Sequence, residues 1–260
     1  MADDIAEILA HEAVKRVTII GHDWGSYLAQ RVYLWHPELR IGLVMLNVAN
    51  APPLPAPFDL PAMLPQQAGE ESFFAYWELF TASDGARVIE AHLHSFYDVL
   101  HLEDQELYRR LWTTRGAFRG WLEADKRLEP AQLRPYARDE GFKAGFIKRI
   151  GRDGMGASLL WYVAYKDNVT YEAEKEVPKG RGIVGLAVLY LGCTGDTVAT
   201  PDSIEPTKQA GLLPALTVKT IESGHWCMVE KPAEVGKVIA NLVQGERVVT
   251  RDWRRCCHAI

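Results

Sequence analysis

The 260-residue sequence has few cysteines, no long apolar run and no excess of basic residues. No run approaches the ~20 apolar residues that a membrane-spanning helix requires. With 29 Lys and Arg against 34 Asp and Glu, the net charge of −5 argues against a nucleic acid or an anionic membrane as the partner. The cysteines have neither metal-ligand spacing nor a disulfide framework, which favours a reducing compartment. They are Cys193, Cys227, Cys256 and Cys257.

The first residues, MADDIAEILAHEAV, are acidic and amphipathic. They lack the basic and apolar regions of a signal peptide and the Arg-rich, acid-poor composition of a transit peptide. The sequence therefore predicts a soluble cytoplasmic protein.

The stretch from Val17 to Leu34 organises the rest of the chain. Val17–Ile20 predicts a short buried strand, Gly21-His22-Asp23-Trp24-Gly25 a turn, and Ser26–Leu34 a helix. A strand, Gly-x-Asp-x-Gly and a helix form the context of a nucleophile elbow, with Asp in the place of Ser. We expect both glycines to be required because the backbones approach closely, so that the Asp23 side chain projects from the turn. The amide of Trp24, at the start of the helix, is then a donor to an anion.

The remaining chain predicts a parallel sheet that is interrupted by an insertion. Residues 51–182 begin with a proline-rich entry and continue with helical, aromatic-rich patterns, whereas residues 246–260 form a basic, irregular tail. Strand and helix alternate on both sides of the insertion, which predicts parallel strands. The expected strands are Val17–Ile20, Ile41–Leu46, Leu186–Leu191 and Leu216–Ile221, and the expected helices outside the insertion are Asp3–Ala13, Ser26–Leu34, Ser203–Ala210 and Ala233–Val243.

Two further polar sites follow predicted strands, at the edge where open α/β sheets gather their chemistry. Asp196 follows the third strand and His225 the fourth. Asp23, Asp196 and His225 thus occur in the order nucleophile, acid, base. Other interpretations stay open: Asp23 as a helix cap, His225 as a packed histidine, Asp196 as a turn residue. Asp202 and Glu205 are alternative acids.

These residues resemble the α/β-hydrolase superfamily and, within it, the epoxide hydrolases. GHDWG is similar to the family's elbow, GDTVATP to its acid loop and SGHWCMVEKPAEV to its histidine loop. FFAYWELF and LLWYVAY resemble the two lid segments that donate tyrosines, here Tyr76 and Tyr162. The resemblance covers residues 3 to 243 and implies an α/β-hydrolase fold. Its core would be residues 1–50 and 183–245, and its helical lid residues 51–182.

The sequence departs from the family before the elbow. The family has several strands there and a His-Gly-x-Pro loop that supplies half of the oxyanion hole, but this sequence contains no His-Gly pair. We expect a chain that is truncated relative to the family, with an incomplete sheet of four strands in chain order. Val17–Ile20 would lie at an open edge, and Trp24 would be the one oxyanion donor that can be named. A catalytically impaired remnant is therefore one hypothesis.

A carboxylate nucleophile limits the reaction, because attack on a carbonyl gives an anhydride whereas attack on a saturated carbon gives an ester. Water then hydrolyses the ester, with His225 as base and Asp196 orienting it. Tyr76 and Tyr162 would hold the oxygen of a small-molecule epoxide, so no metal or organic cofactor is needed. Both tyrosines could instead be aromatic packing, and Tyr165 competes with Tyr162. A haloalkane dehalogenase with the Trp24 indole as halide donor is the alternative.

The last four residues, Cys257-His258-Ala259-Ile260, formally match a prenylation box. His258 is not aliphatic and Ile260 is an atypical last residue, so the sequence favours an unmodified tail. Neither the oligomeric state nor the substrate follows from the sequence.

Overall fold

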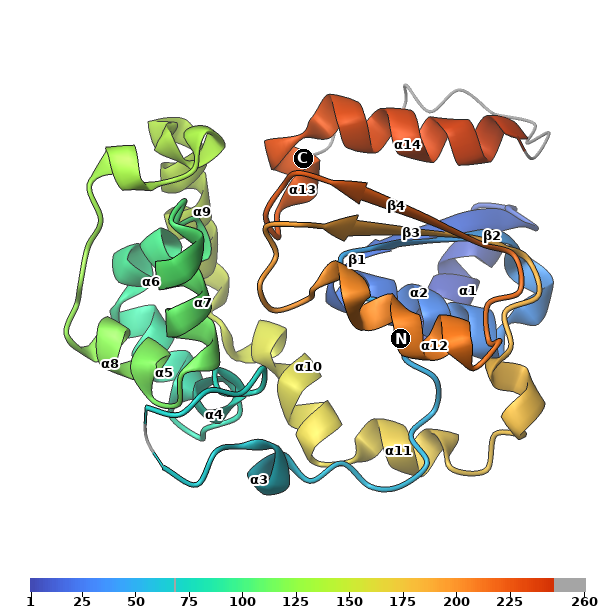
Figure 1. The fold of residues 1–260 in the computed structure, drawn as a ribbon, viewed down its shortest axis with the longest axis horizontal. Coiled ribbons are helices and arrows are strands. Elements are labelled where there is room, and N and C mark those ends of the chain that lie inside the picture. Colours follow the sequence, from blue (N-terminus) through green and yellow to red (C-terminus); the bar gives the residue numbers. More distant parts are fainter. Residues whose placement is uncertain (68, 246–260) are drawn as a thin grey trace.

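Four strands form one parallel sheet in the order in which they occur in the chain, as predicted (Figure 1). The computed structural model describes residues 1–67 and 69–245. The predicted tail and the Cys257 box lie outside the described residues. The elements of the sheet and its flanks are α1 (Ala2–His11), β1 (Val17–His22), α2 (Trp24–Trp35), η1 (Pro37–Leu39), β2 (Arg40–Leu46), β3 (Ala187–Cys193), η5 (Pro201–Ile204), α12 (Glu205–Gln209), β4 (Leu216–Ile221), α13 (Cys227–Glu230) and α14 (Pro232–Gly245).

The two central strands are buried on both faces because successive side chains point to opposite sides of a sheet. Leu43 and Met45 of β2 pack with Tyr33 of α2 on one face. Val44 and Leu46 lie in a second cluster on the opposite face. That second cluster contains Leu189, Leu191, Cys193, Cys227 and Val235. Helix α14 covers this face, and α2 and α12 cover the other (Figure 1).

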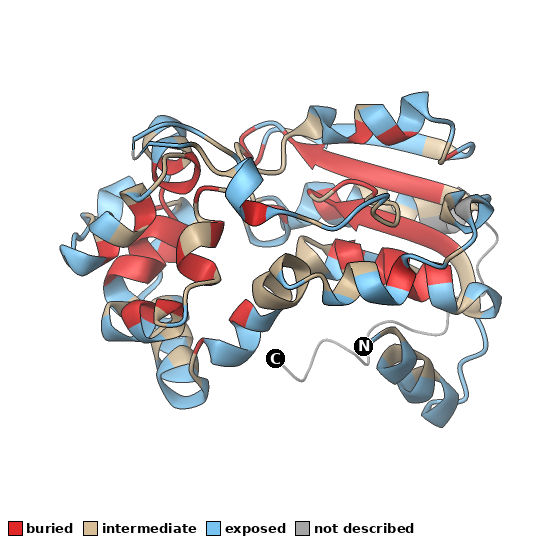
Figure 2. Ribbon diagram, turned by 90° about the horizontal axis from the view of Figure 1, so that it is seen from below, coloured by how far each residue is buried: buried red, intermediate tan, exposed pale blue. Residues whose placement is uncertain are grey.

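The prediction that Val17–Ile20 is buried is wrong. Within the described residues β1 pairs only with β2 and forms an edge of the sheet, and Ile20 is 47% exposed. Helix α1 does not cover it, because α1 contains no buried residue and Ile8 is 57% exposed. In Figure 2 this helix, beside the N-terminus, carries no buried colour. Ile19, whose side chain points to the opposite face from Ile20, is partly buried against the cluster around Tyr33, so the strand is covered on one face only.

The predicted helix Ser203–Ala210 is divided in the structure. Residues Pro201–Ile204 form the 3₁₀ helix η5, and α12 begins only at Glu205, with Pro206 in its first turn. Proline is favoured at the start of a helix because its ring cannot donate the amide hydrogen that an interior position needs. The two prolines thus decide where each short helix begins.

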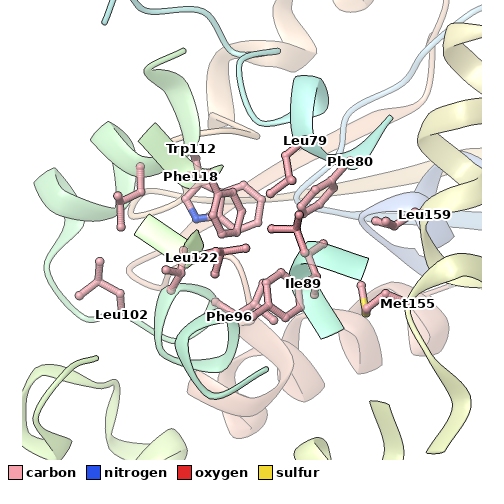
Figure 3. Close-up of a cluster of buried hydrophobic side chains, with 14 of the residues drawn as sticks. Leu79, Phe80, Ile89, Phe96, Leu102, Trp112, Phe118, Leu122, Met155 and Leu159 are labelled. Atoms are coloured by element: carbon pink, nitrogen blue, oxygen red, sulfur yellow. The ribbon is translucent and has the colours of Figure 1, made fainter. Parts of the chain in front are cut away.

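Residues 51–182 are here called the helical segment. Its described residues, all but residue 68, contain no strand apart from two isolated bridges, as the sequence indicates. Its helices surround a separate aromatic and aliphatic core, in which Phe80, Phe96, Trp112 and Phe118 contact one another (Figure 3). Its elements are α3 (Leu60–Met63), α4 (Trp77–Phe80), α5 (Gly85–Ala91), α6 (Leu93–Leu100), α7 (Gln105–Thr113), α8 (Ala117–Glu123), η2 (Pro130–Gln132), η3 (Pro135–Arg138), α9 (Glu140–Asp153), α10 (Gly156–Lys166), α11 (Val169–Glu174) and η4 (Lys179–Gly182).

Helices α4 to α9 lie beyond the carboxyl ends of β3 and β4, toward which the strand arrows in Figure 1 point, whereas α10 and α11 run below α2 and α12 in that view. A buried ion pair holds the last α-helix of the helical segment on the sheet layer: Arg31 of α2 donates two hydrogen bonds of 2.8 Å to the Glu174 carboxylate of α11. Arg31 also donates to the carbonyl of Ala51, where the chain leaves the sheet. The division into a core (1–50 and 183–245) and a lid (51–182) stays a prediction.

The Arg31–Glu174 pair predicts a measurable loss of stability. The two side chains are 9% and 3% exposed, so Glu174→Ala would leave a buried guanidinium without its carboxylate. We expect Glu174→Ala to lower the free energy of unfolding by about 3 kcal/mol, and the double change to Met at both positions to recover part of that loss. Chemical denaturation measures both changes. The control is Arg109→Gln, which breaks an exposed pair with Glu71 and should lower the free energy of unfolding by less than about 1 kcal/mol. Equal losses in Glu174→Ala and Arg109→Gln would contradict this.

Candidate active site

The turn between β1 and α2 presents Asp23 in a strained backbone conformation. Asp23 has φ 52° and ψ −124°, a region that residues with a Cβ atom seldom occupy. Gly21 is required as expected, since a Cβ there would overlap the carbonyl group of Gly25. The expectation for Gly25 is wrong: a Cβ at that position would have no heavy atom within 4 Å. The backbone of Gly25 and Ser26, at the start of α2, lies against Gly21, but no other part of the chain lies against the Cβ position of Gly25.

The Asp23 carboxylate does not cap the helix behind it. Asp23 occupies the N-cap position of α2, but its side chain makes no capping hydrogen bond. It is 34% exposed, and its Oδ1 lies 3.8 Å from Nε2 of His225. A carboxylate that is free of local hydrogen bonds keeps its lone pairs for another partner.

His225 and Asp196 form the closest contact of the site. His225 follows β4, and its Nδ1 lies 2.7 Å from Oδ2 of Asp196. The Asp196 side chain is inaccessible to solvent and also accepts hydrogen bonds from Asn47 Nδ2 and from the amides of Val198 and Ala199. These bonds orient the carboxylate toward the imidazole.

The alternative acids lie elsewhere. Asp202 is exposed on η5, and Glu205 pairs with Lys208 of its own helix. Asp196 is therefore the acid that contacts His225 among the three candidates.

The pKa values follow from this arrangement of charges. Burial raises the pKa of Asp196, but the charge of His225 and hydrogen bonds from His225, the Ala199 amide and Asn47 outweigh it, so the pKa lies below its ordinary value. Burial lowers the pKa of His225, but the charge and hydrogen bond of Asp196, and then the charge of Asp23, raise it to about 9. Without a substrate, the ring is thus an imidazolium between two carboxylates at neutral pH.

His22, beside Asp23, is a neutral neighbour of this ring. Burial, and then the charge of His225, lower the pKa of His22 to about 4. Its Nε2 donates a hydrogen bond of 2.8 Å to the carbonyl of His225, so Nε2 carries the proton. His22 therefore supports the backbone of His225.

Asp23, His225, Tyr76 and Tyr162 line one cavity of about 390 Å³ between the sheet and the helical segment. Most of its other lining is aromatic or aliphatic. The remaining lining residues are Val48, Ala49, Asn50, Phe73, Phe74, Trp77, Phe80, Phe96, Leu100, Tyr108, Trp112, Val198, Ala199, Ser203 and Trp226. Residues from both parts of the chain therefore enclose the candidate nucleophile.

The two tyrosines belong to an aromatic cluster and also face the cavity. The rings of Tyr76 and Tyr162 lie 5.8 Å apart, nearly perpendicular, and both rings contact Phe80. Burial, with a contribution from the charge of Asp23, raises the pKa of both phenols, so both stay protonated and can donate. Tyr165 does not line this cavity; it packs on Tyr27 and Phe58.

Trp24 has two separate roles in the geometry. Its indole stacks on Trp161 at a ring distance of 5.5 Å and does not line the cavity. Its amide belongs to the first turn of α2, where amide hydrogens have no partner inside the helix. The indole also contacts the ring of Tyr162, edge on at 5.2 Å, so Trp24 lies beside the cavity without lining it.

Sequence reasoning missed Tyr108 in the cavity, Asn47 beside Asp196, and the ion pair of Arg134 and Glu230 outside the cavity. Asn47 could have been found, because it directly follows a buried strand at the same sheet edge as Asp23 and Asp196. Tyr108 supplies a third phenol to the cavity. Three helices, α4, α5 and α6, lie between it and Tyr76 in the chain, and no motif around Tyr108 indicates a place in the site. Arg134 and Glu230 meet only through the tertiary fold.

Residues 1–67 and 69–245 contain no group of three or more His, Cys, Asp or Glu side chains that could hold a metal ion. No helix in the described part of the chain is long and apolar enough to cross a membrane. Cys193 and Cys227, the cysteines that the structure describes, are free and buried, and both contact Asn47 Oδ1.

Comparison with known proteins decides the family. The model of the alpha/beta hydrolase family matches residues 1–238, which is most of the chain. The chain belongs to the α/β-hydrolase family. Its four parallel strands and the helices on both sheet faces are thus the predicted α/β-hydrolase fold.

Curated relatives of this α/β-hydrolase include proteins described as epoxide hydrolases. The chain is 23% identical to bifunctional epoxide hydrolase 2 of Rattus norvegicus over 254 residues. The match covers 95% of this chain and 42% of the relative. The chain is also 23% identical to the epoxide hydrolase srdG of Neurospora crassa over 232 residues. That match covers 86% of this chain and 64% of the relative. The chain therefore spans about half the length of these relatives.

Solved structures show the same fold. An epoxide hydrolase from an endophytic Streptomyces superposes with a TM-score of 0.75 at 22% identity, over 95% of this chain and 73% of the other. Epoxide hydrolase A from Mycobacterium thermoresistibile superposes with a TM-score of 0.74 at 20% identity, over 94% and 74% of the two chains. At these identities the similarity establishes the fold.

The elbow glycines give a matched pair of variants. Gly21→Ala would force a Cβ into the backbone of Gly25, so we expect the free energy of unfolding to fall by about 3 kcal/mol. Gly25→Ala meets no heavy atom within 4 Å and lies in the first turn of α2, so we expect no loss of stability. Thermal unfolding of both variants measures the difference. Similar losses in the two would show that the close approach at residue 21 is not as described.

The pKa of His225 can be measured by an NMR titration of its ring. The value of about 9 lies above the 6.5 of an ordinary histidine. The contribution of His225 to the free energy of unfolding is therefore complete below pH 6.5 and is lost as the pH rises through 9. Asp23→Asn removes one of the negative charges that raise the pKa, so we expect a lower value. Asp202→Asn is the control, and an unchanged pKa in Asp23→Asn would rule out this arrangement.

Proposed function

We propose that this α/β-hydrolase opens an epoxide to a vicinal diol through a covalent ester on Asp23. One observation carries the proposal: a carboxylate, an imidazole and two phenols line the same cavity. The likeness to proteins described as epoxide hydrolases supports it. Because the chain spans about half the length of those relatives, the activity needs its own test.

In the first step, one oxygen of Asp23 attacks a carbon of the epoxide ring, and the bond between that carbon and the ring oxygen breaks. Tyr76 and Tyr162 hydrogen-bond the ring oxygen, and one of them gives it a proton as it becomes an alkoxide. The products of this step are a hydroxyalkyl ester on Asp23 and a phenolate. A halide would leave without a proton, so two protonated phenols in the cavity favour an epoxide over a haloalkane.

In the second step, water attacks the ester carbonyl while His225 takes one of its protons. Formation of the ester removes the negative charge of Asp23, which lowers the pKa of His225, and the ring gives its proton to the phenolate that the first step left. The amide of Trp24 donates to the oxyanion. When the intermediate collapses, the imidazolium protonates the departing alkoxide to give the diol. The re-formed acid of Asp23 then gives the second proton of the water to the imidazole, which regenerates the carboxylate, the imidazolium and both phenols.

Asp196 completes the proposed triad. Its contact with Nδ1 places the proton of a neutral His225 on that nitrogen, which leaves Nε2 free to accept from water. The 3.8 Å between Nε2 and Asp23 Oδ1 is longer than a hydrogen bond and leaves the two groups free to act on different partners.

The lining of the cavity indicates an uncharged substrate with an apolar or aryl group. Asp23 and His225 are the charged groups among the lining residues, and about half of the lining side chains are aromatic. A carboxylate or ammonium group on the substrate would lose its hydration there without an opposite charge to pair with. We infer that the helical segment acts as the lid that supplies this lining. A cytoplasmic location stays a prediction from the cysteines.

The test is diol formation from an aryl epoxide such as styrene oxide by the purified chain. We expect the wild type to form diol, Asp23→Ala to be inactive, and Tyr76→Phe with Tyr162→Phe to lose about 100-fold or more in rate. Tyr165→Phe, outside the cavity, is the matched control and should keep its activity. Equal diol formation by wild type and Asp23→Ala would refute the proposal and leave a catalytically impaired remnant. Chloride release from a halo-epoxide without diol would select the dehalogenase.

A further inference from the structure

A second ionic site joins the helical segment to the loop that carries His225. Glu230 of α13 and Arg134, at the start of η3, form an ion pair with Nη1 and Oε2 2.7 Å apart. The Arg134 side chain is 13% exposed and the Glu230 side chain 8%, so the pair is largely removed from water. No residue of this pair lines the cavity.

We propose that Arg134 and Glu230 are positioning residues that hold the loop Ser223–Trp226, and with it His225, in register with Asp23 and Asp196. This inference rests on the proposed function, since it assigns the pair to the hydrolysis of the ester.

Glu230 holds the loop by its backbone. Its Oε2 accepts hydrogen bonds from the amide of Gly224 at 2.8 Å and from the hydroxyl of Ser223 at 3.2 Å, the two residues before His225. The same oxygen accepts from Arg134. Three donors thus converge on one carboxylate oxygen, and the guanidinium supplies the positive charge that a buried carboxylate requires.

Arg134 is itself fixed on the helical segment. Its backbone amide donates to the carbonyl of His101 at 2.9 Å. Its guanidinium packs directly on Gly224, where a Cβ atom would overlap it. Glycine at position 224 is therefore explained by the approach of an arginine from the other part of the chain.

Two neighbouring bonds tie the loop at its other end. Trp226 Nε1 donates to the carbonyl of Leu100 in the helical segment at 3.0 Å. His22 of β1 donates to the carbonyl of His225 at 2.8 Å. The loop is thus held by the helical segment on both sides of His225 and by the elbow at His225 itself.

The consequence concerns the second step of the reaction. Ring opening uses Asp23 and the two phenols, none of which this loop carries. Ester hydrolysis uses the imidazole, which must stay bonded to Asp196 and reach a water beside Asp23. Because a displacement of about 1 Å can cost about 100-fold in rate, a loosened loop should slow hydrolysis selectively.

The experiment compares Arg134→Gln with Arg134→Lys and with Arg138→Gln in the full chain. Arg138 is the last residue of the 3₁₀ helix η3, which Arg134 directly precedes, and it pairs with Glu103, inside the helical segment. Single-turnover reactions with styrene oxide, quenched and analysed by mass spectrometry, give separate rates for formation and hydrolysis of the ester. We expect Arg134→Gln to slow hydrolysis about tenfold or more and ester formation less than about threefold. Arg134→Lys should be intermediate, and Arg138→Gln should match the wild type.

An NMR titration of His225 gives a readout that does not depend on turnover. If the loop moves away from Asp196, the pKa of His225 should fall from about 9 toward 6.5 in Arg134→Gln and stay unchanged in Arg138→Gln. Gly224→Ala displaces the guanidinium without removing it, so it should have the same effects as Arg134→Gln. It replaces Arg134→Gln in both experiments if that variant does not fold.

A lower melting temperature with the wild-type ratio of the two rates and the wild-type pKa would overturn the proposal, because the pair would then be structural only. Absence of diol from the wild type would instead refute the proposed function. In that case the titration alone still decides whether Arg134 positions the ring.

Discussion

The imidazole of His225 stands between two carboxylates, and this arrangement of charges is the constraint on which the rest of the site depends. Asp196 accepts from the ring at 2.7 Å, while Asp23 remains at 3.8 Å. The difference arises from hydrogen bonding: Asn47 and two amides hold Asp196, whereas the Asp23 side chain has no capping bond. One carboxylate is thereby committed to orienting the ring, and the other is left free to react.

The parallel sheet brings these groups together because the carboxyl ends of its strands share one edge. Among the residues that line the cavity, those from the sheet and its loops include no tyrosine and one indole, that of Trp226. The tyrosines and most of the aromatic lining come from the helical segment, whose aromatic core (Figure 3) packs against Tyr76 and Tyr162. In the proposed reaction the loops of the sheet therefore supply the charged groups Asp23, Asp196 and His225, and the helical segment supplies the phenols that donate protons.

The contacts between the two parts are polar as well as apolar. Arg31 with Glu174 and Arg134 with Glu230 are both largely buried ion pairs that join the helical segment to the sheet layer. Buried pairs contribute little net stability compared with apolar packing, but each accepts one geometry only. Such pairs are thus suited to fixing the position of the helical segment relative to the sheet, because apolar contacts alone are less specific in direction.

Sequence alone predicted the four strands and their order, and its motifs pointed to Asp23, Asp196 and His225, which the structure brings close together. Those signals are local, since glycine, proline and strand ends act within a few residues. Tertiary structure alone decided that Gly25 is not required, that Ile20 is exposed, and that Arg134 reaches Gly224. Such facts depend on which surfaces meet in space, and a residue has no local pattern that encodes a neighbour about 90 positions away.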